Sequence, residues 1–137
     1  MNIDKRDASK ALFKQLRALP WKQLQAEIVR FNQAPARERM DRVSLLRAVS
    51  VVLAETGTDA EKTEARAWLI ALLRDPEEKI RRYAMAALAK LEADSEAETA
   101  LNGLVGNTRS EREADQLAQA LARVGGRSEE HTSELQS

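Results

Sequence analysis

Apolar residues recur along most of this chain at steps of three and four positions, with charged and polar residues between them. No stretch alternates between apolar and polar residues as a half-buried strand would. A recurrence at three and four positions places the apolar side chains on one stripe of an α-helix. The stripes are Leu12, Phe13, Leu16 and Leu19; Trp21, Leu24, Ile28 and Phe31; Ala65, Trp68, Leu69, Leu72 and Leu73; Ile80, Tyr83, Ala84, Ala87, Leu88 and Leu91; Ala97, Ala100, Leu101, Leu104 and Val105; and Ala114, Leu117, Leu121 and Val124. Residues 43–54 are apolar nearly all round, which predicts a central, covered helix and brings the expected total to about seven.

Signals at the ends of these segments agree with the pattern. Four predicted helices begin with a hydroxyl or carboxyl side chain that is followed three positions later by Glu, the arrangement of a capping box. The pairs are Thr58 with Glu61, Asp75 with Glu78, Ser95 with Glu98, and Ser110 with Glu113. Pro76 is expected at the first position of its helix. Gly57, Gly106 and Gly125 are expected to close helices in a left-handed conformation.

Two segments of the chain repeat each other. Residues 69–75 align with residues 101–107 at an offset of 32, and residues 86–91 align with residues 119–124 at an offset of 33. A period of this length built from helix pairs predicts a solenoid, because one pair cannot bury its own apolar stripe and must stack on a neighbour. A fainter copy is expected over residues 21–54.

The first repeat has a recognisable layout of helix, turn and helix. Residues 72–92 read LLRDPEEKIRRYAMAALAKLE, which is an apolar helix end, an Asp-Pro turn, a basic pair and a second helix rich in Ala and Leu. This layout resembles the HEAT-like repeats, and most of all the short phycobilisome-lyase type. The resemblance covers residues 61–126 and implies an all-α, right-handed α-solenoid of about three helical hairpins. The family includes scaffolds, lyase subunits and accessory domains of enzymes, so the resemblance specifies architecture more than activity.

The last eleven residues, 127–137, differ from the rest of the chain. They read RSEEHTSELQS, follow two glycines, and resemble over their whole length the translation of a widely used sequencing adapter. We therefore expect a disordered, non-native tail and a natural chain that continues past Gly126. The only histidine, His131, lies in this tail and is not a candidate base or ligand. The expected organisation is a degenerate basic region at 1–56, HEAT-like repeats at 57–126 and the tail at 127–137.

The composition excludes several functional classes. The chain has no Cys, which excludes a disulfide framework, a thiolate nucleophile and a zinc site with sulfur ligands. It has no glycine-rich phosphate loop, HExxH helix or nucleophile elbow, and its paired Glu residues stand in first turns of helices, where capping explains them. No apolar run is long enough for a membrane span, and the amino terminus lacks the apolar core of a signal peptide. We expect a cytoplasmic, non-catalytic protein that binds no cofactor or metal.

Charge is distributed unevenly, although 22 Lys and Arg balance 22 Asp and Glu overall. Residues 1–50 carry 11 basic against 5 acidic residues, whereas residues 51–126 carry 10 against 14. Lys10, Lys14 and Arg17 are spaced to share one helical face, and Lys22 follows them. Such a stripe is a candidate for weak contact with the phosphates of RNA or DNA. The alternative is a solvated helix surface in a highly charged protein.

A second basic group, Lys79, Arg81 and Arg82, directly follows the Asp-Pro turn. It stands at the start of the helix that lines the concave face in HEAT-like solenoids, so the three residues are candidates for binding a carboxylate or phosphate of a partner. The alternative is that Arg81 or Arg82 pairs with Asp75, Glu78 or an acidic residue of the adjacent repeat.

The sequence thus predicts a protein-interaction or scaffold module of HEAT-repeat type that binds its protein partner through the concave face. A rival interpretation is an amino-terminal accessory domain of a nucleic-acid-modifying enzyme, for example an RNA methyltransferase, whose basic first half touches backbone phosphates. A third interpretation, implied by the resemblance alone, is a lyase-type subunit that acts on a bilin-bearing protein.

Overall fold

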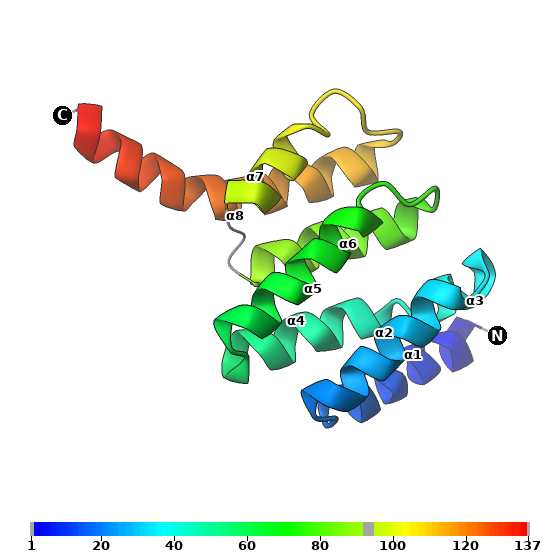
Figure 1. Ribbon diagram of the computed structural model, residues 1–137. Helices are drawn as coiled ribbons and strands as arrows, with labels where there is room; N and C mark the ends of the chain where they lie inside the picture. Colours follow the sequence, from blue (N-terminus) through cyan, green and yellow to red (C-terminus); the bar gives the residue numbers. More distant parts are fainter. Residues whose placement is uncertain (1, 92–94, 137) are drawn as a thin grey trace.

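The computed structural model describes residues 2–91 and 95–136, with side chains over 7–91 and 95–124, and every element within these ranges is a helix (Figure 1). The eight helices found there are α1 (Asn2–Arg17), α2 (Trp21–Gln33), α3 (Ala36–Asp41), α4 (Ser44–Thr56), α5 (Asp59–Leu72), α6 (Glu78–Lys90), α7 (Ser95–Asn102) and α8 (Glu111–Gln136). The all-α class predicted from the periodicity is confirmed. The additional helix is α3, whose six residues contribute no buried side chain, so no apolar stripe revealed it.

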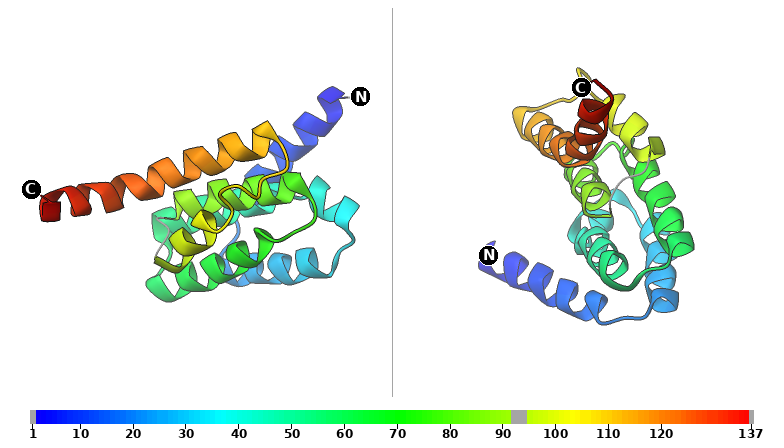
Figure 2. Two further views of the ribbon diagram at one scale, coloured as in Figure 1. Left: turned by 90° about the horizontal axis from the view of Figure 1, so that it is seen from above. Right: turned by 90° about the vertical axis from the view of Figure 1, so that its left-hand side faces the viewer.

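The helices form two rows that lie side by side (Figure 2). We call α1, α4, α6 and α8 the first row, because α1 packs on α4, α4 on α6, and α6 on α8. The second row consists of α2, α5 and α7; α5 packs on α4 and α6, and α7 packs on α8. No described helix covers the first row on the side that faces away from the second row (Figure 2, right).

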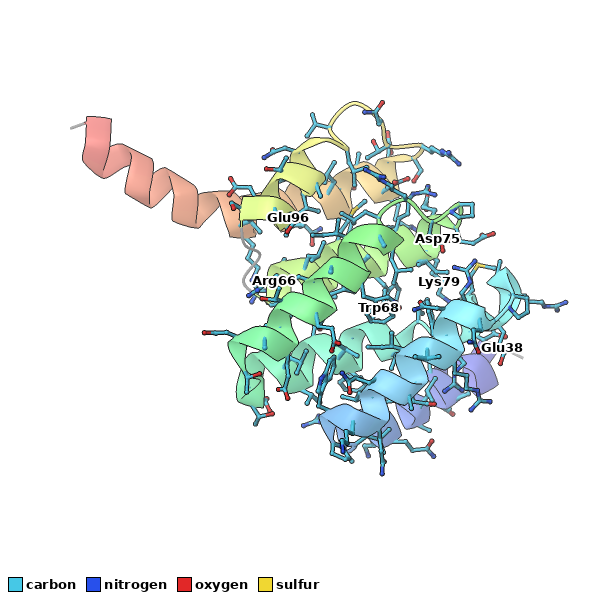
Figure 3. The ribbon with its side chains drawn as sticks, in the orientation of Figure 1. Glu38, Arg66, Trp68, Asp75, Lys79 and Glu96 are labelled. Carbon is cyan, nitrogen blue, oxygen red and sulfur yellow. The ribbon has the colours of Figure 1, made fainter. Side chains whose placement is uncertain are left out.

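The core lies between the two rows, and the predicted stripes supply it. Leu24 and Phe31 of α2 and Leu69 of α5 are completely buried. Trp68 of α5 packs edge-to-face on Phe31 with 5.7 Å between ring centroids, and its indole N–H donates to Asn32 Oδ1 at 2.8 Å. Figure 3 shows Trp68 between α5 and α2. These contacts join α2 and α5, which are neighbours in the second row, and Trp68 makes them from its predicted apolar stripe.

The central helix is α4, which contacts α1, α2, α5 and α6. The expected division at residues 56 and 57 falls between α4 and α5, yet one core crosses it because α4 packs on α6. Five apolar side chains of α4 are buried: Leu45, Leu46, Ala48, Val49 and Leu53. The prediction of a fully covered helix is wrong, because Arg47 is exposed and Val51 is half-buried on the uncovered side of the first row.

Helix starts follow the predicted capping boxes only in part. The box of Thr58 and Glu61 is complete, since the Glu61 N–H donates to Thr58 Oγ1 at 3.1 Å and the Thr58 N–H donates to Glu61 Oε1 at 3.0 Å. Ser95 was predicted to precede its helix as the capping residue, but it is the first helical residue of α7.

The predicted box of Asp75 and Glu78 does not form. The Asp75 carboxylate accepts the backbone N–H of Glu77 at 2.9 Å and pairs with Arg39 of α3. Because Asp75 is engaged in this way, α6 begins at Glu78, and Pro76 precedes the helix instead of occupying its first position.

The glycines expected to close helices behave differently from one another. Gly57 ends α4 in an extended conformation, with φ −78° and ψ 146°, so the left-handed closure predicted there is wrong. A side chain at Gly57 would place Cβ 2.7 Å from the carbonyl oxygen of Leu53, and this close approach accounts for glycine. Gly106 has the predicted positive φ, 83°. Gly125 closes no helix, because α8 continues through it to Gln136.

The backbone of residues 127–136 continues α8 as a helix, where the sequence predicted disorder, and this end projects past the other helices (Figure 1). Extending an existing helix adds one hydrogen bond per residue without a new nucleus, and Glu, Leu and Gln are good helix formers. The side chain of His131 lies outside the described side chains. The non-native origin of this segment stays a prediction.

Candidate functional site: the uncovered face of the first row

Arg81, predicted as a partner-binding residue, is instead buried between α6 and α8, with 6% of its surface exposed. Its Nε and Nη2 donate to the two carboxylate oxygens of Glu113, each at 2.8 Å. Its Nη1 donates to the backbone carbonyls of Asp75 at 2.8 Å and Pro76 at 3.0 Å. Arg81 therefore fastens α8 to α6 and closes the turn before α6, and its burial keeps it from the surface that a partner would contact.

The pairing shifts the protonation of both groups. The hydrogen bonds from Arg81 are the largest cause that lowers the pKa of the Glu113 carboxyl below its ordinary value; the backbone N–H of Arg109, at 3.2 Å, adds to it, and burial opposes it. The same hydrogen bonds raise the pKa of the Arg81 guanidinium against the effect of burial. Both groups are thus charged at neutral pH, as a well-bonded buried ion pair requires.

Glu113 is the acidic residue of the adjacent repeat that pairs with Arg81, an alternative weighed from the sequence, although the sequence did not single out Glu113 itself. The capping box predicted for it is half formed: its N–H donates to Ser110 Oγ at 3.1 Å, but its carboxylate turns to Arg81. Ser110 in turn donates to Glu78. Both cross-helix pairs, Arg81 with Glu113 and Glu78 with Ser110, are separated by 32 residues, the repeat offset found in the sequence. That offset was the signal that could have identified the pairs.

Of the other two residues of the group, Arg82 is half-buried and Lys79 is exposed. The Arg82 Nε is 3.4 Å from Glu78 Oε2, one turn earlier on α6, so pairing within the repeat, the alternative weighed from the sequence, is found. Lys79 is exposed in the first turn of α6 and lines one hollow with Ser9 of α1 and Met40 of α3. Figure 3 shows Lys79 at this end of the molecule, near α3. The structure therefore does not bring the three residues together as one basic surface.

The basic stripe predicted at the amino terminus is divided between two helices. Lys10, Lys14 and Arg17 are exposed on α1. Lys22 is exposed on α2, in the second row. Three of the four candidate phosphate-binding residues thus share one helix of the first row, and the fourth does not extend their stripe.

A groove of about 320 Å³ lies on the uncovered face, across α4, α6 and α8. Among the described side chains that line it, the ionisable ones other than the tyrosine phenol are all cationic: Arg47 from α4, Lys90 from α6 and Arg123 from α8. All three are exposed, and no ion pair is found for them among the described side chains. By contrast, Arg39 and Arg81 are each held by a carboxylate. The groove therefore presents cations whose charge remains available to a ligand.

Between its cations the groove is lined mainly by apolar side chains. Val51 of α4 and Ala86 and Ala87 of α6 line it, with the half-buried ring of Tyr83 among them. Tyr83 belongs to an apolar stripe predicted from the sequence, and it faces the core only in part, since it contacts the core and also lines the groove. Small side chains at the centre leave room that a partner side chain can occupy.

A cation–π contact connects the groove to α1. The Arg47 guanidinium lies 4.3 Å from the centroid of the Phe13 ring, and the Arg17 guanidinium lies 5.7 Å from the same ring. Such a contact holds a cation over an aromatic face while leaving its N–H groups free to donate. The Phe13 ring thus brings the exposed Arg17 of α1 close to Arg47 of the groove.

The described residues offer little for other kinds of site. No group of three or more His, Cys, Asp or Glu within them is placed to hold a metal ion. None of the helices in the described ranges has the length and apolar character that crossing a membrane requires. Comparisons of this chain with family models, with curated proteins and with solved structures give no match.

Proposed function

We propose that this chain is a non-catalytic, HEAT-like repeat module, a right-handed α-solenoid segment that binds a protein partner through the uncovered face of the first row. Cross-helix pairs one repeat apart support the architecture: Arg81 with Glu113, and Glu78 with Ser110. Stacked repeats contact only their neighbours, so interactions at one fixed separation are what such stacking produces.

The groove across α4, α6 and α8 is the observation that carries the binding role. Three helices from different parts of the chain converge on it, and no described element covers it. The most deeply buried carboxylates, those of Asp75 and Glu113, are both held by arginines, which supports a structural rather than catalytic use of the acidic residues.

The proposal is tested by blocking the groove without changing its charge. Ala86 is exposed at the centre of the groove, and Ala67 is exposed on α5 in the second row. The full chain and the variants Ala86→Trp and Ala67→Trp serve as immobilised baits for proteins from the source cells, with recovered proteins quantified by mass spectrometry. We expect a protein that is recovered by the wild type and by Ala67→Trp and is lost with Ala86→Trp. Equal recovery by all three baits would refute the face as the binding surface.

Weak binding of nucleic-acid phosphates is a second candidate function, as in an accessory domain of a nucleic-acid-modifying enzyme. The observation that favours it is the exposure of Lys10, Lys14 and Arg17 on one helix that adjoins the groove. If these residues contact phosphates, the logarithm of the affinity falls linearly with the logarithm of the salt concentration, and replacing all three with Ala reduces that slope by about 2 to 3. Binding that is independent of salt, or absent, refutes this candidate.

A further inference from the structure

We infer that the groove across α4, α6 and α8 accepts an acidic amphipathic segment of a partner protein, with an apolar side chain on the floor and carboxylates against Arg47, Lys90 and Arg123. This inference rests on the proposed function and specifies the chemistry of the partner. Lys90 and Arg123 belong to neither the basic stripe nor the basic group predicted from the sequence, whereas Arg47 comes from the basic first half of the chain.

The groove is basic, although most of its lining residues come from an acidic part of the chain. Residues 51–126 carry 10 basic against 14 acidic residues, yet the described side chains of this part that line the groove include Lys90 and Arg123 and no carboxylate. Arg47 adds a third cation from the opposite wall. Opposite charge across an interface selects partners and speeds their encounter. A ligand that carries carboxylates on both sides of its apolar side chain therefore complements the three cations of the groove.

The floor of the groove selects against a purely ionic ligand. Val51, Ala86, Ala87 and the Tyr83 ring present apolar surface between the cations. Covering that surface removes it from water and favours a ligand that carries an apolar side chain between its charges. The volume of about 320 Å³ is at the low end for ligand pockets, which suits a side chain better than a cofactor.

The aromatic residues near the groove do not suit single-stranded nucleic acid. Such binding depends on exposed aromatic faces on which bases stack. The Tyr83 ring is half-buried against the core, and the Phe13 ring is already covered by the Arg47 and Arg17 guanidinium groups. The groove therefore favours a peptide over a nucleic acid as its occupant.

Arg47 is held in place before a ligand arrives. Its guanidinium stacks on Phe13 at 4.3 Å, so part of its side-chain freedom is already restricted in the free protein. A side chain that is ordered in advance costs less entropy on binding. Arg47 is therefore expected to contribute more to affinity than a freely extended lysine would at the same position.

The test uses fluorescence anisotropy of labelled probes titrated with the full chain. The main probe is a fluorescein-labelled helical peptide with a Leu flanked by Glu three and four positions on either side. Its controls replace Leu with Ala or Glu with Lys, and poly(U) RNA represents nucleic acid. We expect saturable binding of the main peptide that weakens with salt, at least about tenfold weaker binding of each control peptide, and weaker binding of poly(U).

Matched variants locate the binding. Lys90→Glu/Arg123→Glu reverses two cations of the groove, and Lys22→Glu/Arg30→Glu makes the same change on exposed positions of α2. We expect the first variant to bind the main peptide about tenfold or more weakly and the second to bind it as the wild type does. Circular dichroism of both variants verifies that each retains the wild-type helix content.

Several outcomes overturn the inference. Equal weakening by both double variants would show binding by general positive charge, and tighter binding of poly(U) at the groove would assign it to nucleic acid. Concentration-dependent self-association that Ala86→Trp abolishes, measured by light scattering, would assign it to a second copy of the chain. If Ala86→Trp loses a cellular partner but the acidic peptide does not bind, the docking face stands and the acidic chemistry is wrong. If Ala86→Trp retains every partner, the proposed function itself fails.

Discussion

The ion pair of Arg81 and Glu113 offers the sharpest test of how the repeats are held together. Replacing Glu113 with Gln keeps the volume of the side chain and removes its charge, so no cavity contributes to the result. The change removes the carboxylate that accepts two hydrogen bonds of 2.8 Å from Arg81, and it leaves the guanidinium charge without a bonded anion. Removing one partner of a buried ion pair typically costs about 3–5 kcal/mol.

We place the expected loss for Glu113→Gln at about 3 kcal/mol, the lower end, because the Gln oxygen still accepts one hydrogen bond and two carbonyls still face Arg81. A chain of this length has a free energy of unfolding of about 7–20 kcal/mol, so the variant folds but with a clearly reduced margin. With a urea dependence of about 1–3 kcal/mol per molar, the unfolding midpoint falls by about 1–3 M.

The pair can also be removed as a whole. Arg81→Met/Glu113→Leu replaces both charges with apolar side chains and leaves the carbonyls of Asp75 and Pro76 without the guanidinium. Pro76 is exposed and its carbonyl can bond water, so the double variant is expected to lose only about 1–2 kcal/mol. Urea unfolding of the wild type, of Arg81→Met, of Glu113→Leu and of the double variant, followed by circular dichroism, completes a double-mutant cycle. Additive losses, within about 0.5 kcal/mol, would refute the coupling between the two helices.

Three further measurements test other parts of the structure. The pKa of the Glu113 carboxyl is lower in the folded than in the unfolded chain, so the stability that this carboxylate contributes is present above the unfolded pKa of about 4.3 and is lost as pH falls through the folded pKa. The urea midpoint should therefore drop on acidification, and it should drop less in Glu113→Gln. Equal drops in the wild type and in Glu113→Gln would contradict this reasoning. Gly57→Ala brings Cβ within 2.7 Å of the Leu53 carbonyl oxygen and should cost about 1–3 kcal/mol in thermal unfolding, while Gly103→Ala, where the nearest atom would be 3.4 Å away, serves as the control and should change little. Thr58→Ala removes the capping box of α5 and should lower the free energy of unfolding by about 1 kcal/mol. Thr58→Ser should retain the wild-type stability, and a loss in Thr58→Ser equal to that in Thr58→Ala would exclude capping as the cause.

The sequence alone determined where most helices lie and which side chains they bury. The stripes that contain Leu24, Phe31 and Leu69 became the core between the rows, because helical periodicity is a local property that depends on residues three and four positions apart. The capping box of Thr58 is local in the same sense. The six-residue α3 escaped prediction, since a helix that buries no side chain leaves no periodic signal.

Tertiary packing decided the functional surface and the contacts between repeats. Glu113 had a complete local explanation as a capping residue, and only the placement of α8 against α6 showed its carboxylate bound to Arg81. Arg47, Lys90 and Arg123 are far apart in the sequence and come together because α4, α6 and α8 pack side by side. Contacts within a helix follow from spacing along the chain, whereas contacts between helices depend on the register and the direction in which they pack, and these are set by the whole core.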